Sequence, residues 1–169
     1  MKLEKSRANF LEIVNIFEEI KRNNGTYNKT FNMFVLLNCQ KLKSFTEEIQ
    51  IFIEGTPNPE DTGKYLEKEN GIINDYAELD NDGNIIRPSG PNSYSISRKH
   101  LEEFNSAKER LKEEYSKTLS EIEEITKTRK VYLDEKIEIE VQQIPFKHFP
   151  EDFDLTKQQI LLDLITDFE

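Results

Sequence analysis

Apolar residues recur at steps of three and four over most of this chain, with charged residues between them, which is the pattern of amphipathic helices. The pattern predicts one helix over about residues 3–22 and a second over about residues 28–55. The polar run at residues 23–25 ends in glycine and separates the two helices, and Asn28 can cap the second one. Both helices need partners for their apolar faces.

The longest helical pattern covers residues 97–130. A helix of that length extends about 50 Å at about 1.5 Å per residue, which is longer than a small globule is wide. Its apolar stripe must be covered by the first two helices, by another copy of the chain or by a different protein. The stripe consists of Leu101, Phe104, Ala107, Leu111, Tyr115, Leu119, Ile122 and Ile125.

Between these helices the chain is interrupted by loop-forming residues. The stretch TPNPEDTG at residues 56–63 cannot continue a helix or a strand. A weaker helical pattern follows over residues 64–79, and residues 80–96 then form a turn region rich in proline, glycine and asparagine. Within that region, residues near its two ends can pair as a small hairpin: Ile85, Ile86, Tyr94 and Ile96.

The periodicity changes after residue 135. In KIEIEV the apolar residues Ile137, Ile139 and Val141 alternate with polar ones, which predicts a short half-buried strand, and Pro145 ends it or confines it to an edge. A final amphipathic helix is predicted from Thr156, with Gln159 completing a capping box. Its apolar face consists of Ile160, Leu161, Leu164, Ile165 and Phe168.

These elements together predict a mainly α protein. In the predicted arrangement a helical hairpin packs on one long helix, and a small β-hairpin or strand element and a C-terminal amphipathic helix complete the fold. The length of 169 residues suits a single domain over residues 1–169, with a loop at 56–63 and a turn region at 80–96.

The charge of the chain limits its partners. The formal net charge is −10, and residues 134–169 contain 10 Asp or Glu against 3 Lys. Such a chain is poorly suited to binding nucleic acid phosphates or an anionic membrane directly. The acidic end is interpreted either as a solvated surface or as a surface for a basic partner, including mimicry of DNA.

The segment DNDGN at residues 80–84 raises the question of a calcium loop. With Gly83 at the sixth position of an EF-hand, Glu78, Asp80 and Asp82 take the first, third and fifth positions. The twelfth position, however, is Ser89, so the carboxylate that closes the coordination shell is missing. We therefore favour a turn at Asp82 and Gly83, and leave ion binding by residues 80–96 as the less favoured alternative.

Candidate catalytic residues are few. His100 and His148 are far apart in sequence, and neither has the spacing of a metal ligand with another His or with Cys. Cys39 is the only cysteine and lies among apolar residues, which is typical of a core position. Nucleotide, hydrolase and zinc-protease motifs are not found in the sequence, so we expect no enzyme activity and no cofactor or metal.

The segment IPFKHFPEDFDL offers a candidate partner-binding site. Phe146, Phe149 and Phe153 can insert into a groove of another protein, or they can pack on the body of the protein and anchor the last helix. The first interpretation makes these three residues the candidate site, and the second makes them part of the core.

Three stretches carry a resemblance to a family: YAELDNDGNII, KHLEEFNSAKERLKEEYSKTL, and IEIEVQQIPFKHF with LTKQQILLDLI. With the order of elements above, the chain resembles an uncharacterised family of small helical proteins encoded by tailed bacteriophages. The resemblance implies a non-enzymatic accessory or structural protein that contacts another protein or another copy of itself, for example in assembly of the particle. The alternative is an acidic inhibitor that blocks a basic nucleic-acid-binding site of a host enzyme or defence complex.

The start of the chain, MKLEKSRANF, lacks the apolar centre of a secretory signal, and no apolar run is as long as a membrane span. Together with the family resemblance, this predicts a protein of the host cytoplasm or of the virion.

Overall fold

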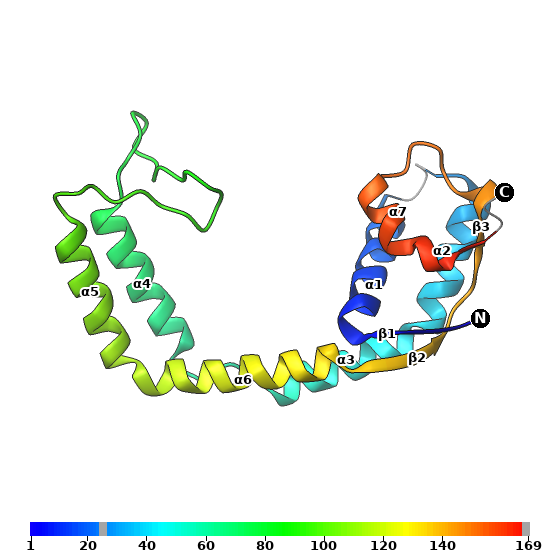
Figure 1. Ribbon diagram of the computed structural model, residues 1–169, viewed down its shortest axis with the longest axis horizontal. Coiled ribbons are helices and arrows are strands. Elements are labelled where there is room, and N and C mark those ends of the chain that lie inside the picture. The colour runs from blue at the N-terminus through cyan, green and yellow to red at the C-terminus, as the bar shows by residue number, and fades with distance from the viewer. Residues whose placement is uncertain (24–26, 167–169) are drawn as a thin grey trace. The chain divides into compact units, whose positions relative to one another are not determined.

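The computed structural model describes residues 1–23 and 27–166, and the chain divides into two compact units (Figure 1). Unit 1 consists of the described parts of Met1–Thr56 and Thr128–Glu169, and unit 2 is Pro57–Lys127. The fold is mainly α, as the sequence predicts. Each unit has its own packing, and the prediction of a single domain stays a prediction.

The chain begins with a strand that the helical pattern did not predict. β1 covers Lys2–Ser6 and pairs antiparallel with β2, Lys136–Glu140. The predicted strand around Ile137 and Ile139 is therefore confirmed, while the predicted helix over residues 3–22 is wrong in its first turn. Ser6 ends the strand and caps the helix, since its hydroxyl accepts a hydrogen bond from the backbone N–H of Asn9.

The first helices form a hairpin within unit 1. α1 covers Arg7–Arg22 and packs on α2, Lys29–Lys41. The predicted cap at Asn28 is confirmed, because its side chain accepts from the backbone N–H of Phe31. The predicted helix over residues 28–55 is nevertheless two helices.

The break lies at Leu42, and α3 then covers Lys43–Gly55. The backbone N–H of Leu42 bonds to the carbonyls of Asn38 and Gln40, and the Leu42 side chain is only 1% exposed. Burial of this side chain accompanies the bend.

Unit 1 has a continuous apolar core. It combines residues of α1 to α3 with residues that follow β2 in sequence. Phe31 lies at its centre, with its ring centroid 5.1 Å from that of Phe149 and 5.7 Å from that of Phe153. Fully buried members are Phe10, Ile13, Phe17, Phe31, Val35, Leu42, Val141, Ile144, Leu161 and Leu164.

Arg7 links the first turn of α1 to two other elements of unit 1. Its guanidinium lies 4.2 Å from the centroid of the Tyr132 ring, and its Nη2 atom is 3.1 Å from Glu48 of α3. Its Nη1 atom also pairs with Glu135, just before β2. The side chain of Arg7 is only 11% exposed, so these pairs are shielded from water on the arginine side.

The end of the chain returns to this core. β3 at Ile144–Pro145 pairs parallel with β4 at Ile165–Thr166. Between them, α7 covers Leu155–Leu161 and continues as a 3₁₀ helix over Leu162–Leu164. The predicted C-terminal helix is thus present but shorter, and its predicted residue Phe168 lies outside the described residues.

The predicted cap of this last helix is wrong. The helix is capped by Asp154, whose carboxylate accepts from the backbone N–H of Lys157. The box of Thr156 and Gln159 lies inside the helix, one position after its first residue.

Unit 2 is built on the helix α4, Thr62–Tyr76, which packs along α5, Leu101–Glu114. The predicted single helix over residues 97–130 is wrong, because the chain leaves helical geometry at Tyr115 and turns before α6, Ser116–Asp134 (Figure 1). Tyr115 packs against Tyr65 of α4, with the ring centroids 5.8 Å apart. This contact between helices accompanies the break.

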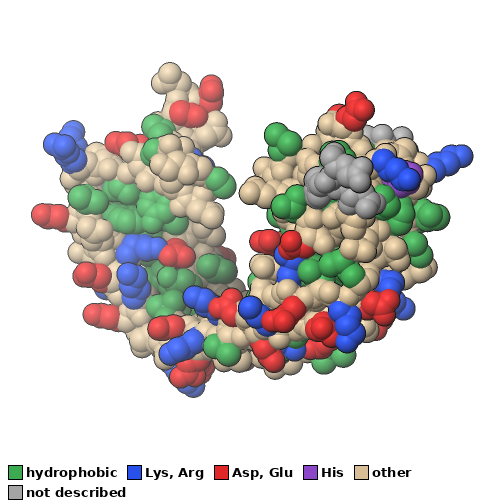
Figure 2. Space-filling model, turned by 45° about the vertical axis from the view of Figure 1, so that its right-hand side comes forward, with side chains coloured by type: hydrophobic (Ala, Val, Ile, Leu, Met, Phe, Trp, Pro, Cys, Tyr) green, Lys and Arg blue, Asp and Glu red, His purple; other side chains and the backbone are tan. Residues whose placement is uncertain are grey.

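The apolar stripe of α5 faces its own unit. Phe104 packs against Tyr76 and Tyr94, with ring centroids 6.2 Å and 5.7 Å away. The predicted packing of the first two helices on this stripe is not confirmed. Charged side chains of both signs follow α6 (Figure 2), and Ile122 and Ile125 of that helix are half-buried. Among the described residues, no helix is long and apolar enough to cross a membrane.

Candidate functional site

α2 is apolar on two opposite faces. Its inner face buries Phe31, Val35 and Asn38 in the core of unit 1. Its outer face is formed by Met33, Leu36, Leu37 and Gln40, and its three apolar side chains are 52%, 51% and 37% exposed. A helix that is apolar all round is normally covered on all sides. The outer face of α2 is therefore the strongest candidate for a surface that a partner covers.

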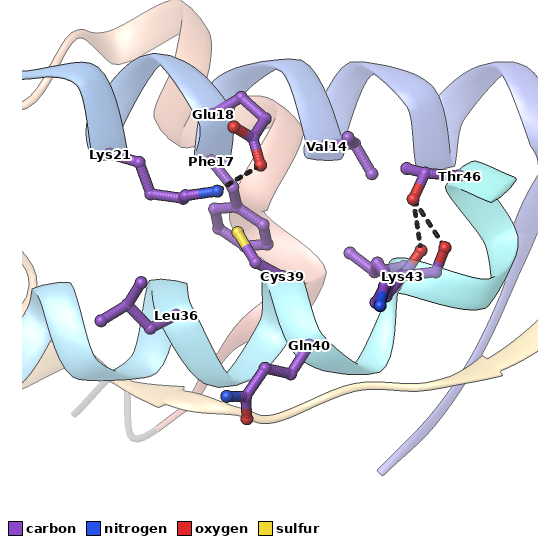
Figure 3. Close-up of a pocket in the computed structure, with 10 residues that line it drawn as sticks. Val14, Phe17, Glu18, Lys21, Leu36, Cys39, Gln40, Lys43 and Thr46 are labelled. Atoms are coloured by element: carbon purple, nitrogen blue, oxygen red, sulfur yellow. Dashed lines mark hydrogen bonds and ion pairs between the residues drawn. The ribbon is translucent and has the colours of Figure 1, made fainter. Parts of the chain in front are cut away.

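A cavity of about 300 Å³ lies beside this face, between α1 and the corner of α2 and α3 (Figure 3). Leu36 and Cys39 of α2 face Val14 and Phe17 of α1 across it. A smaller cavity of about 180 Å³ continues along the same two helices. Leu36 and Lys21 line both cavities, so together these form one groove between α1 and α2.

The charged side chains that line the groove are Glu18, Lys21 and Lys43. The ammonium of Lys21 lies 2.7 Å from the Glu18 carboxylate one turn earlier on α1, and this hydrogen bond raises the pKa of Lys21. Lys43, at the start of α3, lies 3.6 Å from Glu47 on its own helix. The groove therefore offers apolar contact from Val14, Phe17 and Leu36, and its charged lining consists of two lysines and one carboxylate.

Cys39 is half-buried in the groove, with its thiol directed towards Phe17 (Figure 3). Burial raises the pKa of the thiol, and the nearby ammonium of Lys21 opposes this only in part. The thiol is therefore protonated at neutral pH, and the thiolate is the reactive form of cysteine. Its chemistry in this position is that of an apolar contact residue, in keeping with the core position that the sequence predicts.

The three aromatic residues predicted as a partner site are separated by the fold. Phe149 and Phe153 are buried, 8% and 5% exposed, with their ring centroids 5.0 Å apart and both against Phe31. Phe146 lies in the short 3₁₀ helix Phe146–His148 and is 43% exposed. Of the three, Phe146 alone has the exposure that docking requires, while the other two rings anchor the C-terminal segment.

The two histidines lie in different units. His100 is 3.4 Å from Glu103 on the first turn of α5. The His148 ring lies 6.0 Å from that of Phe34 on α2, and its backbone carbonyl accepts from the Asn28 side chain. Over residues 1–23 and 27–166, no three His, Cys, Asp or Glu side chains gather as a metal-binding group.

The DNDGN segment has the geometry of a turn. The Asp80 carboxylate accepts from the backbone N–H groups of Asp82, at 2.9 Å, and Asn84, at 2.8 Å. Gly83 has a φ of 82°, a backbone conformation that glycine adopts without strain. The turn brings Leu79 opposite Ile85 in an antiparallel bridge.

The predicted hairpin of Ile85 and Ile86 with Tyr94 and Ile96 is present in part, because the segment after α4 also takes part in the pairing. Ile96 bridges to Ala77 at the end of α4, and the backbone N–H of Ser95 bonds to the carbonyl of Ile86 at 3.1 Å. The segment after α4 therefore pairs with both later stretches of the turn region.

A wider concavity of about 730 Å³ lies in unit 2 between α4 and this turn region. Its lining is mixed, with Glu69 and Arg87 among amide and apolar side chains. Glu69 is paired with Lys108 of α5, and the Arg87 guanidinium donates to the carbonyls of Pro91 and Ser93. Both charged groups therefore already have partners within unit 2.

Comparison with models of protein families, with curated proteins and with solved structures finds no match for this chain.

The helical pattern over residues 28–55 predicts an amphipathic helix but does not single out the outer face of α2 at Met33, Leu36 and Leu37. The signal was present, because a helix with an apolar stripe on one side carries polar residues on the other, and here both sides are apolar.

Proposed function

We propose that this protein is a non-enzymatic accessory or structural protein of the phage type, and that it works by contact with another protein through the outer face of α2. The observation that carries the proposal is the exposure of Met33, Leu36 and Leu37 on a helix whose opposite face is already buried. Exposed apolar side chains that gather on one surface are typical of a protein contact. The phage assignment, and a role in assembly of the particle, depend on the family resemblance.

A groove adjoins this face and extends the surface that a partner protein can contact. The cavities of about 300 Å³ and 180 Å³ are open to the same surface as Leu36. An anchoring side chain of a partner can enter such a groove while the flat apolar face covers the rest, as in the buried centre of many interfaces.

The competing function is an acidic inhibitor of a basic nucleic-acid-binding site. Its supporting observations are the acidic end, where residues 134–169 contain 10 Asp or Glu against 3 Lys, and unit 2, where residues 57–127 contain 16 Asp or Glu against 10 Lys or Arg. Residues 1–56, which include α2, contain 7 acids against 8 bases. The two functions therefore use different parts of the chain.

The two functions are separated by capture of partners on the immobilised full-length protein. Contact through α2 predicts a partner that is retained in about 0.5 M salt and lost with a Met33→Ser, Leu36→Ser double variant. The inhibitor predicts a partner that is released by salt and by competing DNA, and that both forms retain equally. Retention of the same partners by both forms in high salt contradicts the proposal.

A further inference from the structure

The helix α2 lies in the basic part of an acidic protein. Residues 20–46 contain five Lys or Arg and no Asp or Glu, although the net charge of the whole chain is −10. The five are Lys21, Arg22, Lys29, Lys41 and Lys43. This stretch of sequence thus differs in sign from the chain as a whole, and in the structure Lys21, Lys41 and Lys43 pair with Glu18, Glu140 and Glu47 from outside it.

Two of these lysines flank the groove itself. Lys21 and Lys43 both line the cavity whose floor is formed by Val14, Phe17 and Leu36. Their present partners, Glu18 and Glu47, lie on the same helices as the lysines and are 42% and 60% exposed in their side chains. Glu18 also lines the cavity, so the two lysines leave it with one positive charge in excess. Exposed pairs of this kind contribute little to stability, so the lysines can exchange these partners for carboxylates of another molecule at small cost.

The exposed apolar positions suit a helix as the occupant. Met33, Leu36, Leu37 and Gln40 stand at spacings of three, four and seven and form a ridge beside the groove. A helix that lays its apolar stripe along such a ridge and groove is a recurring form of protein recognition. Anchors at the same spacing on the partner would meet Leu36 and enter the cavity near Cys39.

From these observations we infer that the groove between α1 and α2 binds an acidic amphipathic helix of a partner protein. This inference rests on the proposed function and names the chemistry of the partner. Apolar residues of the partner helix cover Met33 and Leu36, and its Asp or Glu side chains pair with Lys21 and Lys43. A second copy docked through its own α2 would instead bring lysines of both copies together, and like charges oppose association.

The charged and the apolar contacts are therefore expected to affect binding in different ways. Pairs at the rim of an interface chiefly affect specificity and the rate of association, whereas the buried anchors affect how long the complex lasts. High salt is therefore expected to weaken binding a few-fold without abolishing it, in contrast to the behaviour of a DNA mimic.

The test is selection of binders from a display library of helical peptides on the full-length protein. The peptides carry leucines at spacings of three and four, and their other positions are randomised. We expect enrichment of Asp and Glu beside the leucines. A chemically synthesised selected peptide should bind at least ten-fold more weakly to a Lys21→Glu, Lys43→Glu variant and to Leu36→Ser, as measured by fluorescence anisotropy.

Matched control variants separate these effects from loss of folding. Lys117→Glu with Lys127→Glu makes the same charge change on exposed positions of α6, and Ile51→Ser removes an apolar side chain that is 70% exposed on α3. Both controls should bind the selected peptide as the wild type does. Circular dichroism of each variant confirms that its helices are retained.

Three outcomes would overturn the inference. Selected peptides without acidic enrichment, whose binding is still lost with Leu36→Ser, refute the acidic partner and leave the proposed function standing. Peptides that bind all variants equally refute the acidic partner and the α2 surface together. A dimer of the full-length protein in sedimentation that Leu36→Ser dissociates makes a second copy the occupant.

Discussion

The side chain of Asn38 forms two hydrogen bonds with the backbone of Gln142, one as donor and one as acceptor. Its Nδ2 atom donates to the Gln142 carbonyl at 2.9 Å, and its Oδ1 atom accepts from the Gln142 N–H at 2.7 Å. Asn38 is 0% exposed and also donates to the carbonyl of Phe34 one turn earlier. The amide thus joins the inner face of α2 to the segment after β2, where the chain has left its strand and still needs partners for its backbone.

Replacement of Asn38 by leucine is expected to destabilise the protein strongly. The N–H and carbonyl of Gln142 are bonded to a fully buried side chain, and each polar group left without a partner in such a place costs about 1–3 kcal/mol. The free energy of unfolding in urea should therefore fall by roughly 2–6 kcal/mol. Gln40→Ala, an exposed change on the same helix, serves as control and should stay within about 0.5 kcal/mol. Equal stability of Asn38→Leu and wild type would mean that the bond to Gln142 contributes nothing.

Unit 2 is expected to open before unit 1, because it has the smaller core. Its buried apolar residues are Tyr65, Phe104 and Leu111, whereas the core of unit 1 has many more members. Phe104→Ala removes a ring that packs on Tyr76 and Tyr94, so amide hydrogen exchange in α4 and α5 should accelerate at least about ten-fold, equivalent to about 1.4 kcal/mol.

The same measurement on α1 tells whether the chain acts as one domain. Amides of α1 around Ile13 should keep their wild-type exchange rate in the Phe104→Ala variant, since the core of unit 1 contains none of the described residues of unit 2. Equal acceleration in α1 and α4 would show one cooperative domain, as the sequence analysis predicts, and would contradict independent opening.

The sequence predicted correctly those features that depend on interactions between residues close together in the chain. The cap at Asn28 depends on one hydrogen bond three residues away, and the alternation of Ile137 and Ile139 marks β2 by itself. The partner of that strand, β1, was missed because its pairing joins residues such as Leu3 and Ile139 across almost the whole chain. The spacing of apolar residues within a short stretch of sequence carries no information about pairing between strands that are far apart in the chain.

The breaks at Leu42 and Tyr115 were missed for a related reason. Neither position is a glycine or a proline, the residues that interrupt helices by their own backbone preferences. The helix is broken at Tyr115 where its ring meets Tyr65, and at Leu42 where its side chain is buried. Both breaks coincide with contacts to distant residues, which override a favourable local pattern.

The candidate site was only partly predictable. The exposed face of α2 could have been identified from the excess of apolar residues around Met33 and Leu36, but the groove beside it needs the packing of α1, which the sequence does not determine. The aromatic segment was recognised as important, yet sequence alone does not distinguish the buried Phe149 from the exposed Phe146.

Cys39 is expected to react slowly with a thiol reagent in the folded protein. Its thiol is half-buried and burial raises its pKa, so the thiolate fraction at pH 7.5 is smaller than in an unfolded chain. The rate of reaction with Ellman's reagent should be at least ten-fold lower than in urea, and should rise as pH increases. Because Cys39 is the only cysteine, the signal comes from one site. Equal rates in buffer and in urea would contradict the burial of this thiol.

The turn at Asp80 is expected to weaken in acid. The backbone N–H of Asn84 donates to the Asp80 carboxylate, and this hydrogen bond is the main cause that lowers the pKa of the carboxyl below its ordinary value of about 3.9. A lowered pKa in the folded state means that the stabilisation is fully present above the unfolded pKa and is lost as the pH falls through the folded one. The turn should therefore hold at pH 5 and loosen below about pH 4.

Nuclear magnetic resonance checks this dependence directly. The amide protons of Asp82 and Asn84 should shift together with the Asp80 carboxyl carbon, with a midpoint below about pH 3.9. In an Asp80→Asn variant the side chain still accepts these two hydrogen bonds but does not titrate, so the shared transition should disappear while the turn persists. A midpoint at or above about 3.9 for Asp80, or a transition that survives in Asp80→Asn, would show that the carboxylate does not hold the turn, because a group stabilised in its charged form by folding must release its proton more readily than the free side chain does.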